Sequence, residues 1–274
     1  MGAVTRAPLP HEAALWRRLA AEFLGSAFLA AIVIGSGIAA QRLSPSDTGL
    51  ELLENSAATA AGLFAIIVML GPVSGAHFNP VVSFSDAALG GISWRDAAAY
   101  LPAQVVGCVT GAVAANLMFS EAAVSISVKH RATGAHALSE VIATAGLILV
   151  IFALARSGRL ASAPAAVGAY IGAAYWFTAS TSFANPAITI GRMFSDTFAG
   201  IAPSSVPVFI AAQIGGGIAG VAVIRILYPA PAPAQAAAVV AAPETADGQE
   251  LAELAQADGD GGWPARAVPG ETDR

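Results

Sequence analysis

The sequence predicts an all-α membrane protein in which six transmembrane helices surround two shorter re-entrant half-helices, arranged as an inverted repeat. Three observations lead to this fold class. Hydrophobic residues make up 56% of the 274 residues and charged residues only 11%, against roughly 25% charged in a typical soluble domain. Six apolar stretches are long enough to cross the bilayer. Two shorter apolar segments each hold a polar Asn-Pro step, and this pattern occurs twice.

The spans and half-helices follow from the lengths of the apolar stretches. The two short segments, about 72–90 and 182–197, follow a span directly and cannot cross the hydrocarbon core. Irregular backbone is tolerated at that depth only where protein or a water-filled cavity surrounds it, so we interpret both as re-entrant. Arg17 and Arg18 flank the first span, which is too long for a signal peptide. The full spans are expected near 16–40, 53–71, 94–118, 136–155, 163–181 and 205–228.

The chain divides into a short leading segment, a membrane domain and a tail. Residues 1–15 lead into the membrane domain at 16–228, in which repeat one covers about 16–118 and repeat two about 136–228. Residues 229–274 are rich in Ala, Pro, Asp and Glu, and we expect a disordered acidic tail because little apolar surface is available to fold it. The Lys and Arg bias places both termini in the cytoplasm, which indicates a multi-pass protein of the cell inner (plasma) membrane.

The two repeats match in the order helix, helix, half-helix, helix. Three spans in each repeat force the halves into opposite orientation, so the half-helices enter from opposite faces and meet near the midplane. Glycines four apart in the last helix of each repeat allow close helix–helix contact. The matching residues are Glu22, Gln104, Gly107 and Gly111 in repeat one and Glu140, Gln213, Gly216 and Gly220 in repeat two.

The Asn-Pro steps lie in SGAHFNPVV, which begins at Ser74, and TSFANPAIT, which begins at Thr181. Asn is a good helix N-cap and Pro suits the first helical position, so each step begins a half-helix. We therefore expect Asn79 and Asn185 side by side at the centre of a pore, where their amide groups can donate to a solute. The positive ends of both half-helix dipoles point there and disfavour cations.

These motifs resemble those of the aquaporins, the major intrinsic protein family, over about residues 15–228. The resemblance implies the aquaporin fold, a homotetramer with one pore in each subunit, and Glu22 and Glu140 as supports of the loops before the half-helices. A proton-relay role for these glutamates is the lesser alternative. His77 matches a histidine of the cytoplasmic vestibule. The resemblance places Asn79, Pro80, Val81, Asn185, Pro186 and Ala187 at the pore centre, with Val81 in place of the usual Ala and expected to trim the pore slightly.

Relatives narrow the outer end of the pore with four residues at fixed spacings from the asparagines. In this chain those positions are Thr59, Ala173, Ser182 and Ile188. Relatives usually carry an aromatic residue at the first position and an arginine at the last. We therefore expect a wide, uncharged filter that has no aromatic wall and lacks the positive charge that helps to repel cations.

Arg192 lies one helical turn after Ile188 and has two interpretations. In the favoured one, its side chain reaches the outer interface and pairs with Asp196. In the other, it reaches back and replaces the missing filter arginine.

The predicted function is a passive channel for small neutral solutes such as water and glycerol-like polyols. The stretch around Asn185 is also similar to a bacterial aquaglyceroporin-like subgroup associated with arsenic resistance, which implies arsenite or antimonite as neutral hydroxides. An ion-coupled secondary carrier and a non-conducting membrane scaffold remain alternatives. No nucleophile–base set, metal cluster or phosphate loop indicates an enzyme, so we expect no cofactor and no metal. The expected partners are the lipid bilayer and small neutral solutes, and no nucleic acid.

Overall fold

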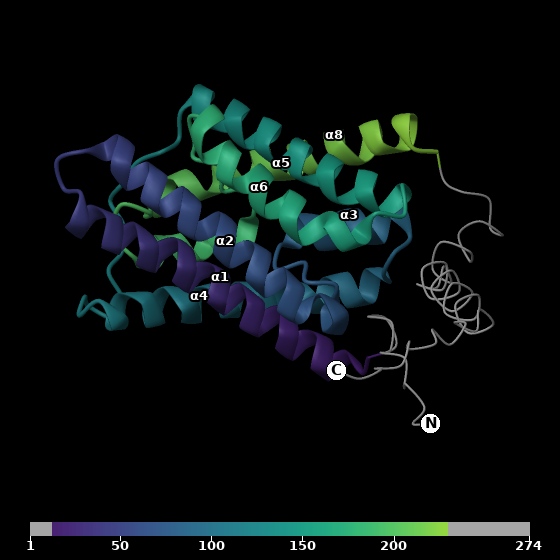
Figure 1. Ribbon diagram of the computed structural model, residues 1–274, viewed down its shortest axis with the longest axis horizontal. Coiled ribbons are helices and arrows are strands. Elements are labelled where there is room, and N and C mark those ends of the chain that lie inside the picture. Colours follow the sequence, from purple (N-terminus) through teal and green to yellow (C-terminus); the bar gives the residue numbers. More distant parts are fainter. Residues whose placement is uncertain (1–12, 230–274) are drawn as a thin grey trace, which may run out of the picture. The chain divides into compact units, whose positions relative to one another are not determined.

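A computed structural model describes residues 13–229, so the predicted acidic tail lies outside the described residues. Within that range the chain is helical and has no strand. Short 3-10 turns cover Leu160–Ser162, Arg192–Phe194 and Pro203–Ser205. The α-helices are α1 (Leu15–Leu43), α2 (Thr48–Ser74), α3 (Pro80–Leu89), α4 (Trp94–Met118), α5 (Gly134–Arg156), α6 (Ala163–Phe177), α7 (Pro186–Gly191) and α8 (Val206–Leu227) (Figure 1).

The predicted fold class is confirmed. Five helices in residues 13–229 are long and apolar enough to cross a membrane, namely α1, α2, α4, α5 and α8 with the turn before it. The two half-helices, α3 and α7, begin at the prolines of the Asn-Pro steps. The start of α1 and the end of α8 lie at the same end of the bundle (Figure 1). We call this the α1 end.

The remaining long helix, α6, is shorter than the sequence predicted. It ends at Phe177 instead of reaching residue 181, and its 15 residues span about 22 Å. Thr178 leaves the helix with φ −114° and ψ 136°, and its backbone amide caps the carbonyl of Ala174. Its hydroxyl donates to the same carbonyl at 2.7 Å. The chain therefore turns early and enters the bundle as an extended loop.

The helices pack as two similar halves. In the first half α1 packs on α2 and α4, in the second α5 packs on α6 and α8, and α2 and α6 join the halves. Each half-helix lies against both α4 and α8. Gly107 and Gly216 face the backbone carbonyls of Phe23 and Val141, where a Cβ would clash. This confirms the close helix contacts predicted from the glycine spacing.

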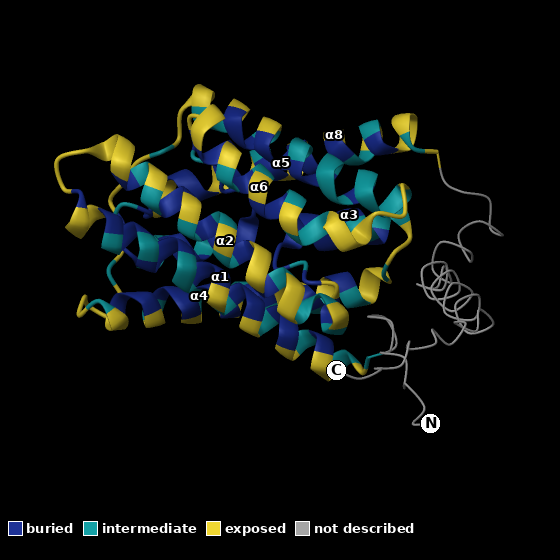
Figure 2. Ribbon diagram, viewed as in Figure 1, coloured by how far each residue is buried: buried dark blue, intermediate teal, exposed yellow. Residues whose placement is uncertain are grey.

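Burial is reversed relative to a soluble protein. Large apolar side chains such as Phe28 and Ile218 are exposed on the outside of the bundle, and Figure 2 shows exposed residues along the outer faces of the helices. Fully buried polar side chains include Glu22, Gln104 and Glu140. Burial removes the hydration of these polar groups, which costs free energy unless hydrogen bonds within the protein replace it. The functional groups of this molecule are therefore found inside it.

Candidate functional site

The loops that lead into the two half-helices have the same strained backbone. Ala76 and Phe78 have φ of 52° and 48°, and Ser182 and Ala184, at the matching positions before Asn185, have φ of 50° and 48°. Non-glycine residues rarely adopt positive φ, and such strain persists only where the surroundings enforce it. The alternation turns successive amide groups to opposite sides of each loop.

A buried glutamate holds the first loop in this conformation. Glu22 accepts hydrogen bonds from the backbone amides of His77 at 3.0 Å and Phe78 at 2.7 Å. It also accepts from the Ser74 hydroxyl at 2.6 Å and the Gln104 amide at 2.8 Å. Four donors around one carboxylate satisfy both oxygens and fix the path of the loop.

Glu140 holds the second loop in the same way. It accepts from the backbone amides of Phe183 at 2.9 Å and Ala184 at 2.8 Å, and from the Gln213 side chain at 2.7 Å. Gln213 also donates to the Thr189 hydroxyl at 2.9 Å, which donates to the carbonyl of Asn185. Each glutamine thus ties a loop to the half-helix that follows it.

The two asparagines cap the half-helices and cross-link the loops. Asn79 Oδ1 accepts from the Val81 amide, and Asn185 Oδ1 accepts from the amides of Ala187 and Ile188. Asn79 Nδ2 donates to the carbonyl of Ala184 at 2.8 Å, and Asn185 Nδ2 donates to the carbonyl of Phe78 at 2.8 Å. A primary amide has two N–H donors. One donor of each asparagine therefore has no acceptor among residues 13–229.

These free donors meet a cavity of about 350 Å³ that runs through the bundle. Both Asn79 and Asn185 line it, together with carbonyl-bearing loop residues on each side. Apolar side chains of α1, α2, α5 and α6 form most of the wall, including Leu29, Val33, Leu63, Leu147, Ile151 and Ile171. A mostly apolar wall with a few convergent polar groups is typical of a small-molecule site.

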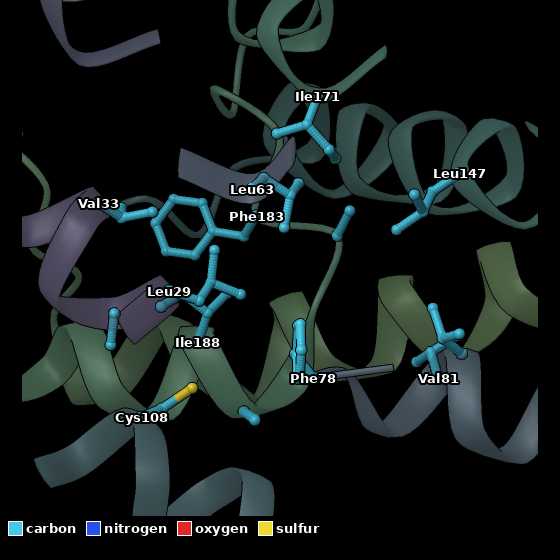
Figure 3. Packing of buried hydrophobic residues seen from close by; sticks show 14 of the residues in the cluster. Leu29, Val33, Leu63, Phe78, Val81, Cys108, Leu147, Ile171, Phe183 and Ile188 are labelled. Atoms are coloured by element: carbon cyan, nitrogen blue, oxygen red, sulfur yellow. The ribbon is translucent and has the colours of Figure 1, made fainter. Parts of the chain in front are cut away.

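The other four residues predicted at the pore centre do not line this cavity. Pro80, Pro186 and Ala187 form the first turns of the half-helices and are buried. The expectation that Val81 trims the pore is wrong, because its side chain packs against Gly217 of α8, which has no Cβ to obstruct it. Figure 3 shows Val81 apart from Ile188 and Phe183.

Three of the four predicted filter residues line the cavity near the end opposite the α1 end. Thr59, Ser182 and Ile188 are each at most 4% exposed. Ala173 is different, because it is exposed on the outside of α6 and is not among the lining residues. Its place in the filter was a wrong prediction.

Tyr175 stands in the wall where Ala173 was expected. It is 3% exposed, lines the cavity, and its hydroxyl lies 3.2 Å from that of Thr59. The expected absence of an aromatic wall is therefore also wrong. Ala173 was predicted from its distance in sequence to Asn185, but the residues between α6 and Asn185 form an irregular loop that does not keep the helical spacing. The signal was available in α6 itself, where Val167, Ile171 and Tyr175 repeat at four-residue spacing and share one face.

His77 lies at the α1 end of the cavity wall. Its Nδ1 lies 3.0 Å from the Ser83 hydroxyl and its Nε2 lies 3.4 Å from Asp86. Its ring meets the ring of Tyr100 edge-on at 5.5 Å. Asp86 also lines the cavity and was not singled out in the sequence. The imidazole is thus oriented by a hydroxyl and a carboxylate.

The favoured interpretation of Arg192 is wrong. Its side chain is 2% exposed, lines the cavity, and lies 3.4 Å from the centre of the Phe183 ring. The guanidinium donates through Nε to the carbonyl of Ala199. Asp196 instead accepts from the backbone amide of Val128. Arg192 therefore turns inward and does not reach the outer interface.

The comparison with family models decides what kind of protein this is. A model of the major intrinsic protein family matches residues 10–184 and, in a second overlapping segment, residues 166–254. The chain belongs to the major intrinsic protein family. Members of this family are membrane channels and not enzymes.

Individual relatives of this major intrinsic protein agree. The chain is 47% identical over 221 residues to aquaglyceroporin AqpS of Rhizobium meliloti (strain 1021), covering 80% of this chain and 94% of the relative. It is 28% identical to the lens fiber major intrinsic protein of Homo sapiens over 80% of this chain and 84% of the relative. The solved aquaglyceroporin of Plasmodium falciparum shares the fold, with a TM-score of 0.60 at 20% identity, over 78% of this chain and 97% of that one.

Proposed function

We propose that this protein is a passive channel for water and neutral solutes of the size of glycerol, and that the solutes pass Asn79 and Asn185. The observation that carries this proposal is the free N–H donor that each asparagine keeps after cross-linking the loops, at a cavity that both residues line. Two donors at the meeting point of two half-helix N-termini suit the oxygen of a water or an alcohol. The same dipoles oppose a cation.

The cavity wall at the end opposite the α1 end has the chemistry to bind a polyol. Thr59 and Tyr175 provide hydroxyls, the Ser182 hydroxyl has no partner within residues 13–229, and Ile188 provides an apolar surface. A polyol has hydroxyls on one edge and a carbon chain on the other, so it can use both surfaces as it loses water. The 47% identity to a protein named aquaglyceroporin supports the same substrate class.

Trivalent arsenic or antimony as a neutral trihydroxide is the second candidate solute. As(OH)3 carries three hydroxyls and no charge, so it presents to the wall a pattern close to that of glycerol. Ile188 places no guanidinium at the narrow end and leaves room for the larger central atom. We include arsenite and antimonite in the proposed range on this basis.

An ion-coupled carrier is disfavoured by the two buried glutamates. A coupling carboxylate must exchange its ion or proton with the pathway. Glu22 and Glu140 are fully buried, hold four and three hydrogen-bond donors, and are absent from the cavity lining. They support the loops instead. A non-conducting scaffold gives no reason for the lined cavity or the free amide donors.

We further propose a homotetramer in the cell inner membrane with both termini in the cytoplasm. Exposed apolar side chains such as Leu24, Val106 and Ile218 require a covering of lipid or of neighbouring subunits. The placement of α1 and α8 at one end agrees with termini on one side, and the excess of Lys and Arg there favours the cytoplasmic side.

Permeability measurements in proteoliposomes test the proposed function. The parent protein should speed osmotic shrinkage and allow glycerol and arsenite to enter down their gradients. Asn79→Leu and Asn185→Leu should each remove most of this flux, because a bulky apolar group replaces a free donor at the crossing. Ala173→Leu, on the outside of α6, is the matched control and should conduct like the parent. Parent vesicles no more permeable than empty ones would refute the proposal.

A further inference from the structure

The predicted filter position Ile188 carries no arginine, yet a buried guanidinium, that of Arg192, lies one helical turn away. Ile188 and Arg192 are four residues apart, and both line the cavity. Residues at this spacing share one face of a helix. The first half shows the same geometry, since Val82 and Asp86 follow Asn79 at the same intervals and also line the cavity. Both positions of a half-helix thus face the solute path.

Arg192 has no carboxylate within ion-pair distance in the part of the chain that the structure describes. Arg192 takes part in none of the three ion pairs found in residues 13–229. Its contacts are the Phe183 ring and the carbonyl of Ala199. A π face and a carbonyl dipole stabilise a guanidinium and leave its net charge in place. Of its five N–H donors, only the one on Nε has a protein acceptor in the described part of the chain.

Two further cations in the preceding loop strengthen the positive potential around this site. Arg131 lies 5.3 Å from the same Phe183 ring and donates to the carbonyls of Gly200 and Phe198. Lys129 donates to the carbonyl of Phe198 at 3.0 Å. Burial first, and then the nearby Arg131 and Arg192, lower the pKa of Lys129 from its usual value. Neither Arg131 nor Lys129 lines the cavity, so Arg192 alone among the three meets the solute.

We propose that Arg192 is the specificity-determining cation of this channel: clamped between the Phe183 ring and the Ala199 carbonyl, it excludes cations and donates to passing hydroxyls from one turn beyond Ile188. This inference rests on the proposed function. Because the arginine lies one turn beyond Ile188, two roles are carried by two different residues. Ile188 keeps the narrow point apolar and open to larger neutral solutes, and Arg192 supplies the electrostatic barrier nearby.

The test measures cation leak and neutral-solute flux in the same proteoliposomes. Arg192→Gln should raise proton and sodium leak by about tenfold or more, equivalent to lowering the barrier by about 1.4 kcal/mol. Arg131→Gln is the matched control, because it removes a cation on the same ring that does not line the cavity. It should leak far less than Arg192→Gln, because its charge lies outside the cavity lining. Equal leak in both variants, or no leak in Arg192→Gln, overturns the proposal.

A rescue variant separates electrostatics from loop support. Placing the guanidinium one turn back, in Ile188→Arg/Arg192→Gln, should restore cation exclusion, whereas a merely structural Arg192 would not be replaced from residue 188. Failure of this double variant to reduce the leak overturns the proposal. Glycerol and water flux of the parent, recorded in parallel, test the proposed function independently. A parent that conducts neither solute refutes that function whatever the variants leak.

A cysteine variant covers the case in which Arg192→Gln does not fold. The chain has one native cysteine, Cys108, and it is buried. In Arg192→Cys a cationic methanethiosulfonate should lower the cation leak and an anionic one should raise it. Identical leak after both reagents, with labelling verified by mass, overturns the proposal because charge at this position then has no effect.

Discussion

The first half of the channel, α1 to α4, and the second half, α5 to α8, share a hydrogen-bonded frame and differ in the side chains that the frame presents. Glu22 and Glu140 hold the loops, and Gln104 and Gln213 tie them to the half-helices. The difference begins two residues before each asparagine, where the first half has a histidine and the second has Phe183.

The side chains that contact these two residues have diverged together. His77 meets Asp86 and the edge of Tyr100, while Phe183 meets Arg192 and the edge of Phe209. In the sequence Asp86 and Arg192 lie seven residues after their asparagines. The α1 end of the cavity is therefore lined by Asp86 together with Arg18 and His77, and the far end by Arg192 and Phe183. The backbone frame fixes where a side chain faces the solute, and its chemistry can then change without altering the fold.

The residue sizes behind the two half-helices differ in opposite directions. In the first half the larger residue, Val81, is on the half-helix and the smaller, Gly217, is on α8. In the second half the smaller residue, Ala187, is on the half-helix, and Cys108 takes the place of Gly217 by its spacing from the glutamine. Cys108 lies against Gly191, one turn from Ala187 on the same face. The larger residue of each pair thus lies on the half-helix in the first half and on the neighbouring long helix in the second.

The largest expected effect comes from the carboxylates that the halves share. In Glu22→Gln and in Glu140→Gln alike, the new amide NH2 must face at least one backbone N–H, that of His77 or of Phe183, because the Ser74 hydroxyl can turn to accept. Each unsatisfied buried group costs about 1–3 kcal/mol. Two N–H groups are left without an acceptor in each variant, so each should be destabilised by about 2–5 kcal/mol.

Thermal unfolding in detergent, followed by reaction of the buried Cys108 thiol with a fluorescent reagent, measures both variants. Ser157→Ala, at the exposed end of α5, serves as the control for handling and detergent. A variant that unfolds at the temperature of the parent would show that the carboxylate of that half does not stabilise its loop, and unequal losses would show that the two frames are not equivalent.

An intermediate effect is expected where Val81 meets Gly217. Gly217→Ala adds a Cβ that clashes with Val81, and overpacking of this kind costs about 1–3 kcal/mol. Val81→Ala should relieve the clash, so the double variant should recover stability with a coupling energy of about 1 kcal/mol or more. Gly215→Ala is the matched control, since its Cβ would meet nothing within 4 Å.

Circular dichroism melts of the four members of this cycle give the coupling energy. The mirror-image experiment uses Ala187→Val, which should be destabilising until Cys108→Gly is added. Additive effects in both cycles would show that the exchange between the halves is coincidental.

The smallest effect is expected at the hydroxyl pair that joins α2 to α6. Tyr175→Phe removes one member of the Thr59–Tyr175 pair, while Thr59 can still bond a solute in the cavity. A lost neutral hydrogen bond is worth about 0.5–1.5 kcal/mol, so glycerol permeability should fall a few-fold and water permeability should fall less. Stopped-flow traces compare this variant with Ala173→Leu. An unchanged ratio of glycerol to water permeability would remove Tyr175 from the proposed filter.

The sequence alone determined the features that depend on periodicity and on local capping. Six apolar spans, two short segments and a repeated order predict the fold class, because hydrocarbon admits few other arrangements. Asn79 and Asn185 are strong caps followed by Pro, so the starts of α3 and α7 follow from local chemistry. The repeat also identified Glu22 and Glu140 as a matched pair before any contact was known.

Only the tertiary structure decided which residues face the cavity where regular helix gives way to loop. The residues after α6 are extended, so helical spacing counted back from Asn185 does not hold across them. The cavity is therefore lined by Tyr175 and not, as predicted, by Ala173. Arg192 turns inward because the Phe183 ring and the Ala199 carbonyl contact its guanidinium, and these contacts replace part of the lost hydration. No helical pattern in the sequence predicts them. Val81 was misjudged for the same reason, since the space for its side chain comes from a glycine on α8. Local rules specify where a chain begins a helix, but the direction of a buried side chain depends on the neighbours that folding brings to it.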